Sequence, residues 1–217
     1  MALFRPPLAL NRTMDFFKLM GCGKNGSFDL KPDWQQYAIF SVINAQHPGS
    51  INDYDTWKKN HYGSFINGFW NFTRAETLSF VLAPISSHGF WDGKKIFPDS
   101  YNNGSSEGPI AVLTRATIRP SKARAFWKNV SPVQNKMKDA RGLIFSVSIG
   151  ELPVIRQATF SIWESEEAMK GFAYQMQEHR DVIRKTRDLN WYSEEMFTRF
   201  RIISSAGSLN GINPLNP

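Results

Sequence analysis

The chain has 217 residues, a length that fits one domain or two closely joined halves. Hydrophobic residues make up 41% and charged residues 21%, which excludes a disordered chain, and 12 Pro and 15 Gly without a repeat exclude a collagen-like one. The 26 Lys and Arg exceed the 19 Asp and Glu by seven but form no cluster of five or more, so we expect no nucleic-acid partner.

Cys22 is the single cysteine, which excludes an intrachain disulfide and a zinc site made of thiolates, and fits a reducing compartment. The first ten residues lack the apolar run of a signal peptide, and no segment approaches the ~18 apolar residues of a membrane-spanning helix. We therefore expect a cytoplasmic protein whose contact with a membrane, if any, is peripheral.

In the first half of the chain the signals for regular structure are few. Residues 1–35 contain the breakers Gly21-Cys22-Gly23 and Asn25-Gly26 and predict irregular backbone. Residues 98–108 are rich in Gly, Ser and Asn and predict a loop that separates the two halves. Between them the pattern predicts a strand at 37–43, a helix that is capped by Asn52 or Asp53 and carries Tyr54 through Phe69, and a strand at 77–83.

The second half has more regular patterning. Residues 156–163 alternate Ala158, Phe160 and Ile162 with polar residues, which is the period of a half-buried strand. Ser165 precedes two glutamates at the start of a long helix, as helix N-termini favour. The predicted order is strand 110–119, a helix from residue 123 that Pro132 interrupts, strands 143–149 and 156–163, helix 165–190 and strand 196–203.

Strand, helix, strand, strand, helix, strand is the order of a ferredoxin-like βαββαβ unit, an antiparallel sheet covered by two helices on one face. The first half shows only strand, helix, strand, so we interpret it as a degenerate copy. We predict an α+β protein with a dimeric α+β barrel-like architecture: residues 1–100 form the N-terminal segment and degenerate half, 109–203 the ferredoxin-like half, and 204–217 a C-terminal tail. Either a second chain or the first half of the same chain can complete the barrel.

His179 lies on the apolar face of the helix predicted at 165–190. Phe172 and Met176 lie seven and three residues before it and Ile183 four residues after it, the spacing of a buried stripe. Neutral imidazole is the usual protein ligand of haem iron, and an apolar pocket suits a porphyrin. On spacing alone a satisfied core histidine is the commoner outcome, so both interpretations stay open here.

Other groups carry weaker signals. His61 shares the apolar face of the first predicted helix, whereas His88 and His47 fit a loop and a turn. Cys22 between two glycines is typical of a small buried thiol, and the two glutamates at 194–195 diverge in a strand and are expected to be solvated. The chain has no dinucleotide-binding, phosphate-binding or serine-nucleophile motif.

The stretch Thr159-Phe-Ser-Ile-Trp-Glu-Ser-Glu-Glu-Ala168, followed by His179, resembles the signature of the antibiotic-biosynthesis-type haem monooxygenases, a superfamily of dimeric α+β barrels. The resemblance implies that His179 is the axial ligand of the iron of haem b and that Trp163 lies close to the macrocycle. It also implies that Thr114 is the polar residue on the distal side of the haem.

A second resemblance extends over nearly the whole chain, to the spheroidene monooxygenase family. It implies a haem-containing oxygenase that introduces a keto group at C-2 of an acyclic carotenoid, using dioxygen and electrons from a donor such as ferredoxin. The segments that carry it, in the same order, are residues 1–5, 17–23, 114–120, 149–153, 157–163 and 191–200, together with His179.

We predict a catalytic set and a haem-binding set within residues 109–203. Strand arginines are included because haem propionates need cationic partners, and Arg141 and Arg199 are further candidates for that role. The expected partners are an apolar small-molecule substrate, an electron donor and a second copy of the chain. The predicted catalytic residues are Thr114, Arg115 and Trp163, and the predicted haem-binding residues are His179, Phe145, Phe160, Phe172, Met176 and Arg156.

Rival functions stay open at this point. One is another haem enzyme on the same scaffold that acts on a nitrogen-containing compound or on haem itself. Another is a haem-binding protein without turnover. A barrel without a cofactor, held together by its aromatic core, is the plainest alternative.

Overall fold

The computed structural model describes residues 2–24, 32–43, 53–99, 108–175 and 189–216. The chain forms two compact units. The first unit consists of residues 1–19, 39–83 and 202–217, and the second of residues 20–38 and 84–201. The units are interleaved along the chain, whereas the sequence predicts consecutive halves.

The second unit contains the ferredoxin-like order of elements that the sequence predicts. The elements are β4 (Ile110–Ile118), α4 (Ala123–Lys138), β5 (Leu143–Leu152), β6 (Arg156–Trp163), α5 (Glu166–Gln175) and β7 (Tyr192–Gly207). The central strand β4 pairs antiparallel with β6 on one side and with β7 on the other, and β6 pairs antiparallel with β5. The resulting strand order, β5-β6-β4-β7, confirms the ferredoxin-like prediction.

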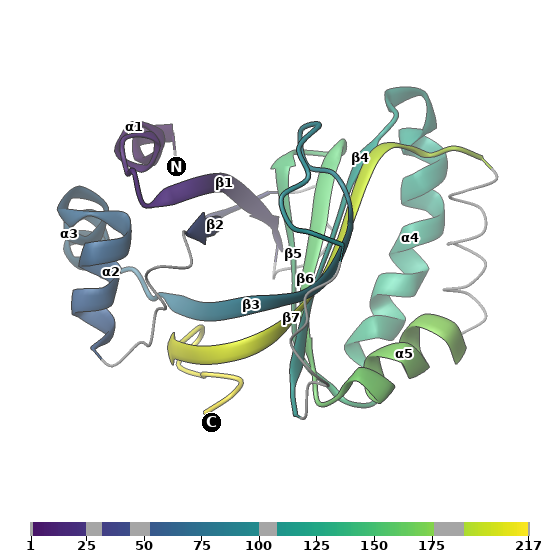
Figure 1. Cartoon of the computed structure of the whole chain (residues 1–217). Helices are drawn as coiled ribbons and strands as arrows, with labels where there is room; N and C mark the ends of the chain where they lie inside the picture. The colour runs from purple at the N-terminus through teal and green to yellow at the C-terminus, as the bar shows by residue number, and fades with distance from the viewer. Residues whose placement is uncertain (1, 25–31, 44–52, 100–107, 176–188, 217) are drawn as a thin grey trace. The chain divides into compact units, whose positions relative to one another are not determined.

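Helices α4 and α5 lie on the same face of these four strands (Figure 1). Ile110 and Val112 of β4 belong to one buried cluster with Met169 of α5, and Ile118 belongs to another with Phe126 of α4. Because side chains alternate along a strand, the odd-numbered residues of β4 face the opposite way. We call the two faces the helix side and the reverse side of the sheet.

Helix α4 is continuous across Pro132, where the sequence predicts an interruption. Proline removes one N–H donor and crowds the preceding turn. The helix is nevertheless held on the sheet by apolar residues near its start: Phe126 is buried, and its ring lies 6.1 Å from that of Trp191. Packing of an apolar face outweighs a local helix-breaking preference here.

The first unit begins with a 3₁₀ turn at Ala2–Phe4 and a short helix, α1 (Arg5–Ala9), which the sequence analysis missed. Its buried core consists of Phe4, Leu8 and Ile66. The elements that follow, some of which continue into the second unit, are β1 (Met14–Gly23), β2 (Pro32–Ile43), α2 (Tyr54–Tyr62), α3 (Ser64–Thr73) and β3 (Leu78–Gly89).

Strand β1 and helix α1 replace the irregular backbone expected for residues 1–35, so that expectation is wrong. Gly21 and Cys22 pair with Gly150 and Ile149 of β5. Pairing with a neighbouring strand keeps these residues extended despite the weak strand preference of glycine. Met20 and Cys22 are buried and Gly21 is exposed, which is the alternation of a half-buried strand.

The single helix expected up to Phe69 is two helices that meet at Gly63. Gly63 has a φ of +86°, a backbone conformation that other residues adopt only with strain. Asp53 caps α2 as predicted, since its side chain accepts hydrogen bonds from the backbone N–H groups of Asp55 and Thr56. Helices α2 and α3 lie against each other (Figure 1).

The seven strands form one sheet in the order β2-β1-β5-β6-β4-β7-β3. Strands β1, β2, β3 and β7 each continue from one unit into the other. The protein is therefore an α+β protein, as predicted. Within the described ranges, no helix is long and apolar enough to cross a lipid bilayer.

Candidate active site

The helix side of the sheet in the second unit carries the predicted residues Trp163 and Phe172. Trp163, at the end of β6, is 2% exposed, and its Nε1 donates a hydrogen bond to Ser161 Oγ (3.0 Å). The ring of Phe172 on α5 lies 5.3 Å from the ring of Trp163. Together the two rings form an apolar wall between β6 and α5.

Thr114 is exposed although it lies in the middle of the central strand β4. The residues two positions before and after it on the same face, Val112 and Ala116, are buried. Its cross-strand neighbours are Thr159 on β6 and Phe197 on β7. The helix side of the sheet is therefore accessible at Thr114, where a hydroxyl group can meet a bound molecule.

The predicted axial ligand His179 and its neighbour Met176 lie outside the described residues. Helix α5 is described as far as Gln175. It begins where the sequence predicts, and Ser165 Oγ accepts a hydrogen bond from the N–H of Ala168 (3.2 Å). The roles of His179 and Met176 stay predictions.

Phe145 and Phe160 lie on the reverse side of the sheet. Their ring centroids are 6.4 Å apart. Phe160 pairs with Leu113 and is three residues before Trp163, so its side chain points away from the helices. Because the strands separate them from Phe172, one planar macrocycle does not contact both sets of rings. The structure thus puts Thr114, Trp163 and Phe172 on one side and Phe145 and Phe160 on the other.

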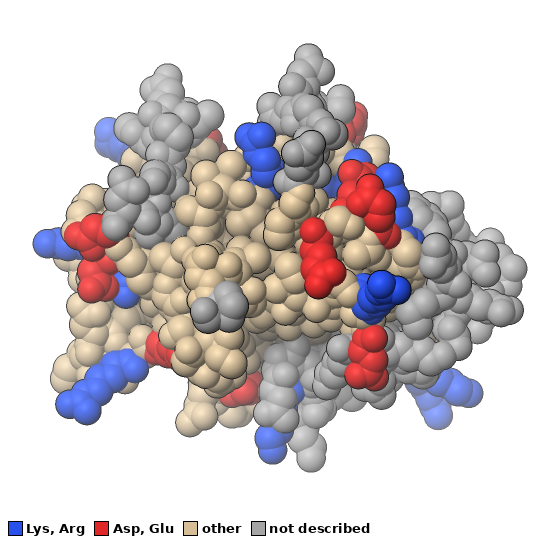
Figure 2. Space-filling model, turned by 90° about the horizontal axis from the view of Figure 1, so that it is seen from below, with Lys and Arg blue, Asp and Glu red and all other residues tan. Residues whose placement is uncertain are grey.

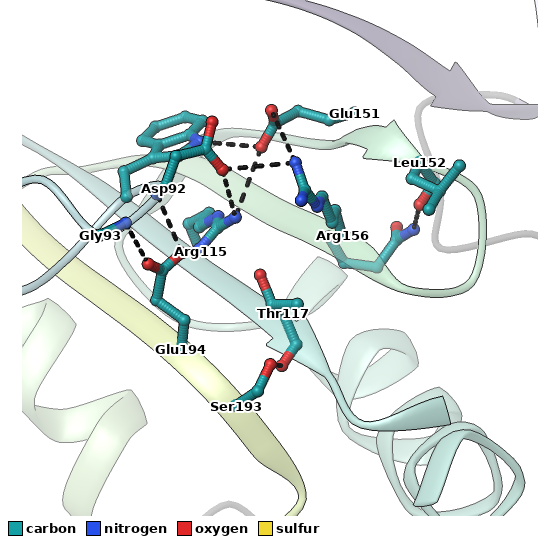
Figure 3. Close-up of polar contacts among 11 residues, drawn as sticks. Asp92, Gly93, Arg115, Thr117, Glu151, Leu152, Arg156, Ser193 and Glu194 are labelled. Atoms are coloured by element: carbon teal, nitrogen blue, oxygen red, sulfur yellow. Dashed lines mark hydrogen bonds and ion pairs between the residues drawn. The ribbon is translucent and has the colours of Figure 1, made fainter. Parts of the chain in front are cut away.

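On the reverse side, charged side chains from β5, β7 and the turn after β3 surround Arg115 (Figure 3). Arg115 of β4 is 2% exposed, and its Nη1 donates a hydrogen bond to Oε1 of Glu194 on β7. Its Nη2 lies 3.6 Å from Oε1 of Glu151 on β5 and 3.7 Å from Oδ1 of Asp92. The guanidinium also lies over the ring of Trp91, 5.5 Å from its centroid. A cation buried to this extent needs such partners.

Arg156 of β6 joins this cluster from its more exposed edge. Its Nη1 lies 3.3 Å from Oδ1 of Asp92 and 3.9 Å from Oε2 of Glu151. Both Arg115 and Arg156, which the sequence analysis placed in the site, are therefore paired with carboxylates. Three carboxylates face two guanidinium groups in the cluster, so its net charge does not favour an anionic propionate.

Glu194 connects the turn after β3 to β7. Its Oε2 accepts a hydrogen bond from the N–H of Gly93 (2.6 Å) and its Oε1 one from the N–H of Asp92 (3.0 Å). Burial acts to raise the pKa of Glu194, but these hydrogen bonds and the contact with Arg115 hold it below its ordinary value. Glu194 is therefore ionised at neutral pH.

An open pocket of about 670 Å³ lies beside Glu194. Its lining residues include Phe90, Tyr192, Glu194 and Glu195. Carboxylates in the lining disfavour an anion and leave a neutral or cationic group as the better fit. This pocket therefore does not match a dianionic porphyrin.

Arg199 is the candidate arginine on the helix side. It pairs with Val112 across the strands, forms an ion pair with Glu166 at the start of α5, and donates a hydrogen bond to Ser86 Oγ (2.9 Å). A hydrogen bond from Lys170 and the charge of Arg199 hold the pKa of Glu166 below its ordinary value. Arg141, the other candidate, is exposed near the start of β5.

Two other side chains that could in principle bind iron are poorly suited to it. Burial, and then the negative charge of Asp33, raises the pKa of Cys22 to about 12, so the thiol stays protonated. Burial lowers the pKa of His61 to about 4, which keeps the imidazole neutral, so its contacts and not its charge disfavour iron. The Nε2 of His61 is hydrogen-bonded to Ser41 Oγ (3.0 Å) and its ring stacks on Trp57 (4.9 Å), contacts that satisfy a core histidine.

Sequence reasoning missed Asp92 and Glu151 and expected Glu194 to be solvated, which is wrong. Glu194 lies two residues before Met196, the cross-strand partner of Arg115, so its side chain shares the reverse side and reaches the guanidinium diagonally. The register between β4 and β7 therefore brings the cluster together. The spacing of residues within one segment gives no information on that register.

On the face drawn in Figure 2, groups of Lys and Arg and groups of Asp and Glu lie among larger areas of other residues. The described basic residues on that face do not form the continuous stripe that nucleic-acid-binding proteins present. The expectation that the chain has no nucleic-acid partner stays a prediction.

Comparison with known proteins places the chain in a family. No family model matches it. A spheroidene monooxygenase of Rhodobacter capsulatus is 35% identical over 218 residues, which covers 99% of this chain and 86% of that protein. The chain belongs to the spheroidene monooxygenase family. Two further spheroidene monooxygenases are similar to the chain. The one from Rubrivivax gelatinosus is 35% identical over 90% of this chain and 72% of that protein, and the one from Cereibacter sphaeroides is 32% identical over 92% and 59%.

Membership of the spheroidene monooxygenase family makes the chain an oxidoreductase, and it confirms the resemblance identified in the sequence. Solved structures are more distant. A protein from Fusobacterium nucleatum has a TM-score of 0.44 at 9% identity, over 94% of this chain and 83% of its own. A cofactor-independent oxygenase from Streptomyces nogalater has a TM-score of 0.34 at 10% identity, over 41% and 89%.

The described residues fit a haem better on the helix side than on the reverse side. The helix side offers the wall of Trp163 and Phe172 and the accessible hydroxyl of Thr114, and its one carboxylate–arginine pair, Glu166 with Arg199, is balanced in charge. The reverse side offers an excess of carboxylates around Arg115. An apolar wall without an excess of carboxylates suits the apolar ring of a porphyrin better than the reverse side does.

Proposed function

We propose that the chain is a haem-dependent monooxygenase that introduces a keto group at C-2 of an acyclic carotenoid such as spheroidene. The observation that carries the proposal is the 35% identity to a spheroidene monooxygenase over 99% of the chain. The geometry of the helix side supports it, because an apolar wall and the exposed hydroxyl of Thr114 on the same side of the sheet suit a long apolar substrate.

In this proposal each residue of the helix side has a separate task. His179 holds the iron, and haem, when bound, supplies the activation of dioxygen. Trp163 and Phe172 exclude water from the space between β6 and α5. Thr114 provides the polar contact on the exposed part of β4, and Arg199, which pairs with Glu166, is the candidate that would share its charge with a propionate.

The proposed reaction balances as two oxygenations of one carbon. Each consumes one dioxygen, two electrons and two protons, places one oxygen atom in a C–H bond and releases the other as water. The second oxygenation gives a geminal diol, which loses water to leave the ketone. The electrons come from an external donor, for which a ferredoxin is the proposed class, and the proposed active form is a cytoplasmic homodimer.

The cofactor is tested by the absorption spectrum of the full-length protein, expressed with a haem precursor and measured with and without carbon monoxide. We expect a Soret band typical of histidine-ligated haem. A protein that shows no Soret band after haem reconstitution would overturn the haem part of the proposal. Loss of the haem spectrum under reductant and air, without a carotenoid product, would favour haem degradation instead.

The reaction is tested in a host that accumulates spheroidene. Expression of the chain should give a product that has gained one oxygen and lost two hydrogens, as measured by mass spectrometry. Thr114→Val should reduce the yield of ketone, whereas Thr117→Val, a matched change on the reverse side, should leave it unchanged. Equal yields from the two variants would remove Thr114 from the site.

A further inference from the structure

Helix α3 of the first unit presents three phenylalanine rings to solvent. Phe65, Phe69 and Phe72 are 58%, 41% and 88% exposed. They are four and three residues apart, so they lie along one face of the helix, and we call them the α3 stripe. The adjacent face packs into the core of the unit through Ile66 and Trp70. The helix is therefore amphipathic with a second, unburied apolar face.

The start of the chain adds to this surface. The ring of Phe4 lies 5.2 Å from the ring of Phe69, with its plane nearly perpendicular. This contact places the sequence neighbours of Phe4, Leu3 and Arg5, beside α3. Leu3 is 67% exposed and Arg5 is exposed as well. An aliphatic side chain and a cation thus lie close to the α3 stripe.

Arginines are the charged residues next to the α3 stripe in sequence, and the nearby Glu76 is held away by hydrogen bonds from Ser208 and the backbone N–H groups of Asn210 and Gly211. Residues 1–12 and 64–74 contain Arg5, Arg12 and Arg74 and neither Asp nor Glu. All three arginines are exposed, and Arg74 follows α3 directly. Exposed aromatic rings flanked by cations are the composition of a segment that lies in the interfacial region of a bilayer with anionic lipids.

A second copy of the chain fits this surface less well. A two-fold contact through the α3 stripe would bring the same patch together twice and set the arginines of the two copies against each other. An anionic lipid surface complements the arginines and accepts the phenylalanine rings. Helix α3 has 10 residues, too few to span a bilayer, so it would lie along the surface.

We infer that the α3 stripe docks the protein on an anionic lipid surface, with the phenylalanine rings among the headgroups and the arginines at the phosphates. The inference stands independently of the proposed reaction. It also gives that reaction access to a carotenoid, because a long apolar substrate is dissolved in the bilayer.

The test is flotation of the full-length protein with vesicles of phosphatidylcholine alone and of phosphatidylcholine with phosphatidylglycerol. We expect binding to the anionic vesicles that weakens as salt is raised. Phe72→Ser should weaken this binding roughly tenfold, because the ring loses its apolar contact with lipid. Arg74→Asn, which suits the left-handed backbone at that position, should weaken it about fivefold.

Matched control variants are Leu152→Ser and Arg124→Gln, in the second unit. Leu152 is 49% exposed and Arg124 is exposed on α4, and both variants should bind vesicles as the unchanged protein does. Failure of the unchanged protein to float with anionic vesicles would overturn the inference, as would equal losses in Phe72→Ser and Leu152→Ser. A change in oligomeric state in Phe72→Ser, seen by light scattering without any change in vesicle binding, would overturn it in favour of a contact between copies.

Discussion

Replacing Arg115 by methionine should destabilise the fold by about 3 kcal/mol at neutral pH, because it leaves three carboxylates without their buried cation. The low end of the range for such a loss applies, since the side chains of Glu194 and Glu151 keep 20% and 13% exposure and can recover some hydration. For a chain of this size the loss corresponds to a fall in Tm of about 9 °C. Arg156→Met is the matched control: its side chain is 42% exposed, and its removal should cost less than about 1 kcal/mol.

The dependence on pH makes this prediction sharper. The pKa of Glu194 is lowered in the folded protein, so its pairing stabilises the fold above the ordinary carboxyl pKa and is lost as pH falls through the folded value. The difference between Arg115→Met and the unchanged protein should therefore be largest near neutral pH and shrink below about pH 4. Urea unfolding near neutral pH and below about pH 4, followed by circular dichroism, measures this difference in stability. The reasoning would be refuted if Arg115→Met and Arg156→Met lost equal free energies of unfolding. It would also be refuted if the loss in Arg115→Met did not change with pH.

Two further predictions concern the cofactor and the backbone. His179→Ala should abolish the Soret band, and circular dichroism should show that the fold is retained. The control variants Cys22→Ser and His61→Ala should keep the band. Loss of the band in one of these controls, and not in His179→Ala, would assign the iron ligand to that residue. Gly207→Ala should destabilise the protein by about 2 kcal/mol, because φ is +79° and a Cβ would collide with the backbone oxygen before β3. Gly211→Ala, at a φ of +75° with open space around it, should cost less in the same urea titration, and a reversed order would count against the collision.

The ferredoxin-like unit is predictable because its elements carry their own period. Strand β6 alternates apolar and polar residues over 156–163 and forms over Arg156–Trp163. Helix α5 starts after Ser165, which the capping pattern indicates. In these segments the local preference and the tertiary packing favour the same structure, so the residues of the segment alone predict its secondary structure.

Other features depend on contacts between segments that are distant in sequence, so the residues of one segment alone do not predict them. Strand β1 includes two glycines and is held by pairing with β5, more than a hundred residues away. Helix α4 continues through Pro132, with Phe126 before it in one buried cluster and Met137 after it packed against another. In the candidate site, the exposure of Thr114 and the pairing of Arg115 with Glu194 both follow from the register of β4 with its neighbours.

The boundaries between the two compact units fall inside strands, at residues 19–20 of β1, 38–39 of β2, 83–84 of β3 and 201–202 of β7. Boundaries between domains usually lie in loops. Recombination between genes at such a loop leaves the domain on each side of it intact. In this chain a crossover in any loop between β1 and β7 divides both units, since neither is encoded as one continuous stretch. Recombination at loops therefore transfers neither unit by itself, and the two units must be inherited together.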